Sequence, residues 1–163
     1  MNMSLATTIM TCLCGMITMA DLPQAKGWCG IMPLRSTRAD VERVLGSPTK
    51  SHGVAFTYDT KKERVLIFYS AGPCKKGVSD EWNVPPDTVV SITVHPNAKL
   101  LVDSLQLDKT KYRRERDPHA DLVVYYVNKE EGIRISARML QEGEDVDSIT
   151  YEPGTEDSHL RCR

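Results

Sequence analysis

A short helix signal at residues 36–48 constrains this chain more than any other stretch. Ser36 and Thr37 offer N-cap hydroxyls, and Asp40 lies three residues after Thr37, where the acid of a capping box belongs. Gly46 permits a left-handed cap at the C-terminus, and a proline two residues later prevents further helical turns. A helix of about nine residues is too short to be stable in water by itself. It must therefore pack on a sheet formed by the strands that follow.

The helix and the strands after it have complementary patterns. Val41, Val44 and Leu45 stand at i, i+3 and i+4, which predicts one apolar stripe facing the sheet. Runs rich in β-branched and aromatic residues predict six strands. These runs cover residues 54–58, 64–70, 88–95, 122–127, 133–140 and 146–152. Hairpin-length polar turns at 59–63 and 128–132 indicate antiparallel pairing.

The two halves of the chain follow the same order of segments. Residues 58–65 align with 126–133, and 91–96 align with 148–153, which predicts a duplicated unit with an insertion in the loop 71–87. Chance similarity between β-rich segments is the alternative. The predicted class is α+β: one antiparallel sheet with short helices on one face, in two tandem helix-plus-three-strand units.

A second, degenerate helix is expected at residues 108–116, where Tyr112 is the lone large apolar residue. This segment carries a cluster of basic residues. The cluster is interpreted either as a docking face for an acidic partner or as a solvated surface. Its members are Lys109, Lys111, Arg113, Arg114 and Arg116.

The first twenty residues predict export. Residues 1–20 carry no charged side chain, whereas Asp21 begins a richly charged stretch. Small residues, Thr18 and Ala20, stand at −3 and −1, so we predict a signal peptide of residues 1–20 and a secreted or periplasmic protein. One alternative is an uncleaved anchor, through which residues 1–20 would make the protein's contact with the membrane. Another is a lipoprotein modified at a cysteine of this segment.

Length and charge limit the rest of the chain. Residues 21–163 are predicted to form one α+β domain, with unit one at about 31–96, unit two at about 97–153 and a tail at 154–163. The net charge of −1 gives no general attraction to nucleic acid or to an anionic membrane. We expect a monomer.

Cysteine usage predicts a disulfide. Three cysteines remain after cleavage, and they allow three single pairings. We favour Cys74 with Cys162, because Cys74 lies in a loop and the bridge would hold a chain end that otherwise frays. Cys29 is then the unbridged thiol. Three reduced thiols are expected if the protein is not exported.

The segment 34–48 resembles the helix-and-turn signature of the SmpA/OmlA (BamE)-like and β-lactamase-inhibitor-protein-like families. In those families a small residue and Thr open a helix that ends in a hydrophobic residue, Gly, any residue and Pro. Residues 27–162 also resemble an uncharacterised family of exported bacterial proteins, in which segments like 72–74, 82–85 and 159–162 recur. The resemblance implies an antiparallel sheet, tandem copies, and binding of proteins rather than catalysis.

The loop 71–87 is the strongest candidate for a contact with a partner. It places Trp82 among acids and prolines on a surface loop, and aromatic side chains often dominate protein interfaces. Two prolines stiffen the loop and lower the entropic cost of binding. The predicted partner-binding residues are Trp82, Val84, Pro85 and Pro86. The alternative is that Trp82 covers one end of the sheet.

The densest polar group is Asp117, His119 and Asp121, which fits either a divalent-metal or general-base site, or a polar turn. The chain contains no nucleophile elbow, phosphate-binding loop or metalloprotease helix. We predict no catalytic residues, metal or cofactor, and no nucleic-acid partner. The predicted function is a non-enzymatic module that binds another protein. The alternatives are a small exported metal-dependent enzyme and a structural envelope protein or lipoprotein without a discrete site.

Overall fold

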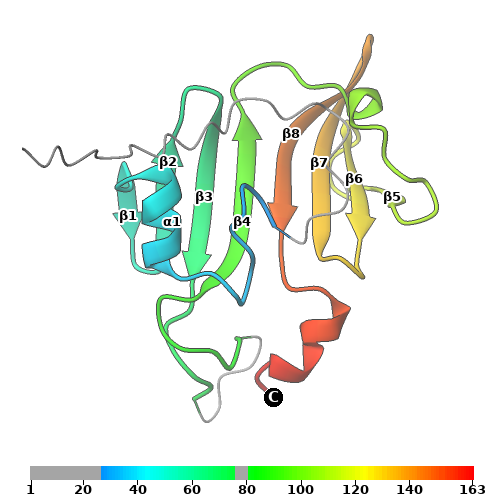
Figure 1. The fold of residues 1–163 in the computed structure, drawn as a ribbon. Coiled ribbons are helices and arrows are strands. Elements are labelled where there is room, and N and C mark those ends of the chain that lie inside the picture. Colours follow the sequence, from blue (N-terminus) through cyan, green and yellow to red (C-terminus); the bar gives the residue numbers. More distant parts are fainter. Residues whose placement is uncertain (1–26, 76–80) are drawn as a thin grey trace, which may run out of the picture.

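A computed structural model describes residues 27–75 and 81–163 and contains one eight-stranded antiparallel sheet (Figure 1). The helical elements are α1 (Arg38–Leu45) and two 3₁₀ helices, η1 (Val102–Leu105) and η2 (Thr155–Leu160). The strands are β1 (Lys50–His52), β2 (Ala55–Asp59), β3 (Glu63–Tyr69), β4 (Val89–Pro96), β5 (Arg113–Arg116), β6 (Val123–Asn128), β7 (Ile133–Leu140) and β8 (Gly143–Tyr151).

The sheet consists of two four-stranded halves that meet in its middle. The strand order is β1-β2-β3-β4-β8-β7-β6-β5, so the halves join between β4 and β8. The backbone ladder between these two strands is short: Ile92, Thr93 and Val94 face Tyr151, Thr150 and Ile149. Beyond this ladder the two strands separate, because β8 carries an extra residue, Asp147, against β7, and β4 ends at Pro96, which has no amide hydrogen.

Helix α1 begins with the predicted capping box. The Asp40 carboxylate accepts a hydrogen bond from the Thr37 amide at 2.8 Å, and the Asp40 amide donates to the Thr37 hydroxyl at 3.4 Å. Val41 is fully buried and Leu45 packs against the core, whereas Val44 is 37% exposed. The predicted apolar stripe is therefore wrong at Val44, because the short helix lies on the sheet through a narrower face.

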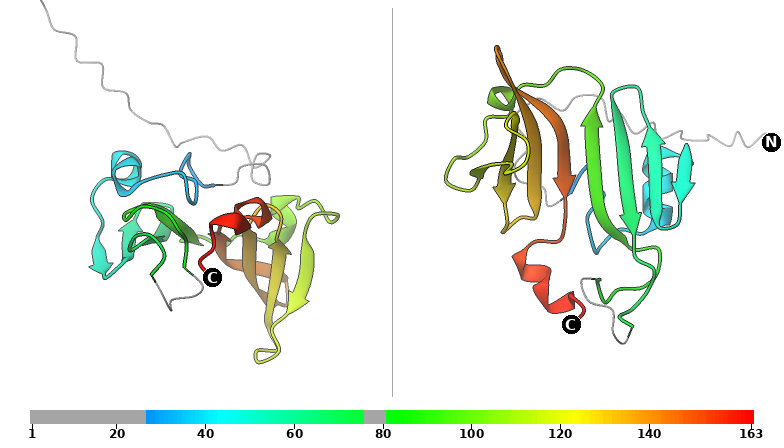
Figure 2. Two further views of the ribbon diagram at one scale, coloured as in Figure 1. Left: turned by 90° about the horizontal axis from the view of Figure 1, so that it is seen from below. Right: turned by 180° about the vertical axis from the view of Figure 1, so that it is seen from behind.

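One face of the sheet is covered and forms the core. Helix α1 lies over the first half, the segment 27–36 over the middle near β4 and β8, and the segment 97–112 over the second half (Figure 1 and Figure 2, left). Alternate residues of the central strands point into this core. They include Val65, Ile67, Ile92, Val94, Ile133, Ile135, Ile149 and Tyr151, all of which are buried.

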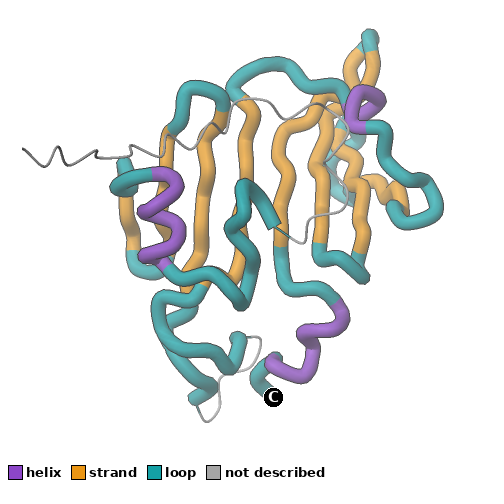
Figure 3. The backbone as a smooth tube through the Cα atoms, in the orientation of Figure 1, coloured by secondary structure: helices purple, strands orange, loops and turns teal. Residues whose placement is uncertain are grey.

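The predicted fold class is wrong, because the described residues are predominantly β and contain one short α-helix (Figure 3). Residues 108–116 form a turn followed by β5, which pairs with β6. A helix there would have had no apolar face to bury, whereas the turn places Tyr112 in the core. The chain is not built from two helix-plus-three-strand units, and the predicted tandem repeat has no support.

The six predicted strands correspond to β2, β3, β4, β6, β7 and β8, and their ends agree within three residues. The predicted signal peptide, residues 1–20, lies outside the described residues, so its cleavage and its alternatives stay predictions. In the part of the chain that is described, no helix has the length and apolar character needed to cross a membrane. The proposed division of residues 21–163 also stays a prediction.

Candidate functional site

The long loop between β3 and β4 is joined covalently to the C-terminal tail. Cys74 and Cys162 form a disulfide with Cα atoms 5.5 Å apart, and this is the pairing that the sequence favours. The bridge connects residues 88 positions apart in the chain. Cys29 lies outside this bridge and packs against the core.

Residues 81–87, here called the Trp82 loop, also pair with the tail without covalent bonds. The Arg161 guanidinium carbon lies 5.7 Å from the centroid of the Trp82 ring, within the range of a cation–π contact. Two backbone hydrogen bonds hold the segments together, from the Asn83 amide to the Leu160 carbonyl (2.7 Å) and from the Cys162 amide to the Glu81 carbonyl (2.8 Å).

The other end of the Trp82 loop is attached to α1. The Arg38 amide donates to the Asp87 carbonyl at 2.9 Å, and the Arg38 guanidinium forms an ion pair with the Asp87 carboxylate. The same guanidinium lies 4.2 Å from the centroid of the Phe56 ring and 5.2 Å from that of Tyr69. One arginine therefore connects the helix, the loop and the sheet.

The tail is held in place at Asp157. This side chain is only 7% exposed and accepts a hydrogen bond from the Arg35 guanidinium at 3.2 Å. Beside the pair lies a pocket of about 40 Å³, lined among others by Met32 and Glu131. A pocket of this size has room for a water molecule rather than for a substrate.

The predicted partner-binding residues differ in accessibility. Val84 is 7% exposed, so its side chain is unable to contact a partner without rearrangement. Trp82 is half-buried, and Pro85 and Pro86 are exposed. The accessible part of this predicted contact is therefore the proline pair and one part of the indole ring.

The Asp117 carboxylate is engaged inside a polar turn. Its two oxygens accept hydrogen bonds from the His119 amide and the Tyr125 hydroxyl, both at 2.8 Å. These bonds, the first of them most, lower the pKa of Asp117. The side chains of His119 and Asp121 are exposed. Across residues 27–75 and 81–163, no group of three or more His, Cys, Asp or Glu side chains is placed to hold a metal ion.

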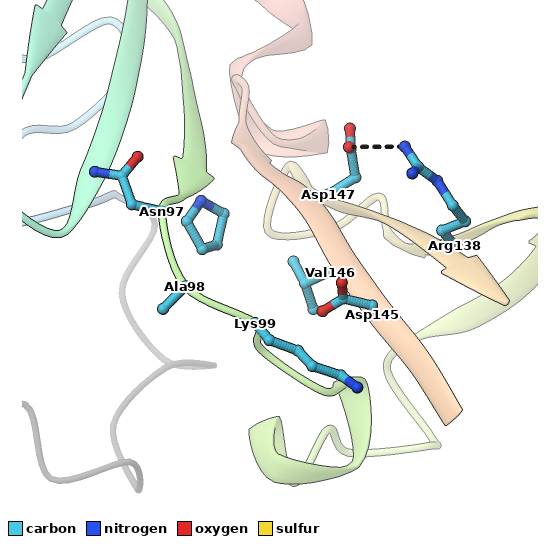
Figure 4. A pocket seen from close by; sticks show the side chains of 8 residues that line it. Asn97, Ala98, Lys99, Arg138, Asp145, Val146 and Asp147 are labelled. Carbon is cyan, nitrogen blue, oxygen red and sulfur yellow. Dashed lines mark ion pairs between the residues drawn. The ribbon is translucent and has the colours of Figure 1, made fainter. Parts of the chain in front are cut away.

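A second pocket, of about 260 Å³, lies where β4 and β8 separate (Figure 4). Its walls come from residues 96–99 and from β7 and β8. Arg138 pairs with Asp147 there at 3.6 Å, and Lys99 pairs with Glu142 at 2.6 Å. The pocket lacks the apolar lining that small-molecule sites usually have, and both of its cations are neutralised.

The basic cluster at residues 109–116 is also largely compensated. Three of its cations form ion pairs with nearby carboxylates. The pairs are Lys111 with Glu131, Arg113 with Glu115, and Arg114 with Glu144. This arrangement reduces the charge that the cluster offers to an acidic partner.

Sequence reasoning did not identify Arg38, Asp87 or Arg161 as residues that fix the Trp82 loop. The position of Arg161 next to a predicted disulfide cysteine was the available signal for that residue. Arg38 and Asp87 carry no pattern that distinguishes them from other surface charges, because their partners are distant in the sequence.

No protein-family model and no curated protein matches this chain. Among solved structures, the chain is similar to a DUF4309 family protein, YjgB, from Bacillus subtilis subsp. subtilis str. 168. The TM-score is 0.47 with 14% sequence identity, over 78% of this chain and 84% of that chain. A similarity of this degree carries no statement about function. The resemblances to an uncharacterised family of exported proteins and to BamE-like families stay predictions.

Proposed function

We propose that this protein is a non-enzymatic module that binds another protein through the Trp82 loop. The observation that carries the proposal is the way in which the loop is held. Two backbone hydrogen bonds attach one end to the tail that carries the disulfide, and the contacts of Arg38 with Asp87 fix the other end. Between them, Pro85 and Pro86 are exposed.

A fixed loop is suited to recognition. Loops carry a large share of binding residues, and ordering a flexible loop on binding costs free energy that a fixed loop does not lose. Prolines add to this effect because they restrict the backbone in the unbound state. The indole of Trp82, partly accessible beside the prolines, supplies the aromatic contact area that is common at the centres of interfaces.

We further propose that the protein works outside the cytoplasm as a monomer, after removal of residues 1–20. Two sequence features support export: the uncharged segment at residues 1–20 and the use of cysteine in a bridge, which oxidising compartments favour.

The experiment compares capture of partners by four forms of the oxidised protein. These are the wild type, Trp82→Ala, the double variant Pro85→Ala/Pro86→Ala, and the control Pro48→Ala in the turn after α1. Each is immobilised and exposed to envelope and secreted proteins from the source cells, and captured proteins are quantified by mass spectrometry. We expect a protein retained by the wild type and the control to fall about tenfold with either loop variant. Equal retention by all four forms contradicts the proposal.

A further inference from the structure

The uncovered face of the sheet carries one continuous row of side chains across all eight strands. Directly paired residues lie on the same face of a sheet, so the register defines the row. From β1 to β5 in spatial order it contains Lys50, Thr57, Leu66, Thr93, Thr150, Arg134, Val127 and Arg113, here called the outer row.

None of these eight side chains is buried. Their chain neighbours on the other face include Val65, Val94, Ile149 and Ile135, all of which belong to the core. Seen from behind, the strands face the viewer without a helix in front of them (Figure 2, right). In the part of the chain that is described, this face therefore has no covering layer.

The outer row is apolar and hydroxylated at its centre and contains cations but no acid. Thr93 and Thr150 share a hydrogen bond of 3.2 Å between their hydroxyls, and Leu66 and Val127 lie half-buried on either side. Arginine is enriched at protein interfaces, and the buried centres of interfaces are more apolar than the rest of the surface.

Arg134 differs from the other arginines of this face. Three of those arginines are paired with a carboxylate on the same face: Arg64 with Asp59, Arg113 with Glu115, and Arg138 with Asp147. Arg134 is exposed, and no carboxylate of the described residues lies within ion-pair distance of it. The Asp117 carboxylate accepts hydrogen bonds from the Tyr125 hydroxyl and the His119 amide and forms no ion pair with Arg134.

We propose that the outer row is a second binding surface, which takes an acidic protein segment with a carboxylate paired to Arg134. Charge complementarity favours this occupant. Arg134 lies between Thr150 and Val127 in the outer row and has no carboxylate paired with it among the described residues. A nucleic acid needs several uncompensated cations, which this face does not offer. A second copy placed face to face brings the cations of one row against those of the other. The surface shares no residue with the Trp82 loop.

The test uses isotope-labelled full chain with its disulfide intact and three synthetic peptides as probes. The first peptide alternates Tyr with Asp and Glu, the second replaces the acids by Asn and Gln, and the third replaces them by Lys. Binding is followed by amide chemical shifts in NMR at low and high NaCl. The variants are Arg134→Gln and Arg134→Glu, with Lys61→Gln, an exposed cation of the β2–β3 turn, as the control.

We expect the acidic peptide to shift the amides of Arg134, Thr150 and Val127 and to bind about tenfold more weakly to Arg134→Gln. High salt should weaken the binding, and Lys61→Gln should leave it unchanged. Arg134→Glu should prefer the Lys peptide. The proposal is overturned if the acidic and neutral peptides bind equally, if the shifts lie elsewhere, or if millimolar acidic peptide causes no shift.

Discussion

Removal of the disulfide should destabilise the protein strongly. We consider the double variant Cys74→Ser/Cys162→Ser, in which the two chain positions, 88 residues apart, are no longer linked. On the chain-entropy model, closing a loop of this length lowers the entropy of the unfolded state and so raises its free energy by about 4 to 5 kcal/mol at room temperature. Because a domain of this size loses a few degrees of Tm per kcal/mol, the midpoint should fall by roughly 10 to 20 °C.

Urea unfolding followed by circular dichroism measures this loss, with Cys29→Ser as a control that keeps the bridge. The double variant should have a lower midpoint, and the control should change little in comparison. Hydrogen exchange should accelerate at the Asn83 amide, which donates to the tail. A loss below about 1 kcal/mol would refute the reasoning, since the unfolded chain would then not be restricted by the bridge as the model requires.

Three further substitutions test the fold. Hydrogen bonds at the helix N-terminus and an ion pair lower the pKa of Asp40 from 3.8 to about 2. The ionised Asp40 carboxylate therefore stabilises the fold above pH 4, and this stabilisation disappears towards pH 2. Asp40→Asn should remove this pH dependence from the free energy of unfolding. Gly132 has φ +69°, and Gly132→Ala places a Cβ 2.0 Å from the Glu152 carbonyl oxygen, so this variant should lose more than about 3 kcal/mol of stability. Gly53 also has a positive φ but has open space around it, so Gly53→Ala should lose roughly 1 kcal/mol. Val41→Ala should cost about 2 kcal/mol and Val44→Ala less than about 0.5 kcal/mol.

Each of these comparisons has a contradicting outcome. An unchanged acid transition in the Asp40 variant would mean that the capping box contributes nothing measurable. Equal losses for the two glycine variants would mean that the turn at Gly132 relaxes freely. Equal losses for the two valine variants would place the helix on the sheet in another orientation.

The sequence pattern identified the helix and those strands whose apolar residues recur at the spacing of one buried face. Helix α1 and six strands carry their own signals, because capping residues, glycine and β-branched runs act locally. Position 44 was assigned to the core by helical spacing alone. The structure shows that an eight-residue helix buries less of its surface than that spacing suggests.

The two edge strands could not be predicted by the same reasoning. Every residue of β1 is exposed, and β5 consists of three arginines and a glutamate. Neither strand has apolar residues at alternate positions, and each forms because the neighbouring strand supplies its hydrogen-bond partners. Charged edge strands also discourage pairing with other chains. Their composition therefore reflects their position in the sheet more than an intrinsic preference.

The candidate site was predictable in its covalent part only. Cysteine count and position favoured Cys74 with Cys162, and proline content marked the loop as stiff. The burial of Val84 and the role of Arg38 depend on contacts between distant segments, which no local pattern encodes. Arg134 differs from its neighbours because no described carboxylate pairs with it, and the strand register is needed to identify those neighbours.

The pairing of β4 with β8 sets the order in which this protein can be completed. β4 is finished at Pro96, but the partner for its second edge ends at Tyr151. During synthesis, the first four strands can assemble while the edge that carries Ile92 and Val94 remains unpaired. An unpaired strand edge is prone to association with other chains. Cys162 lies C-terminal to β8, so oxidation of the bridge has to wait until all eight strands have been synthesised.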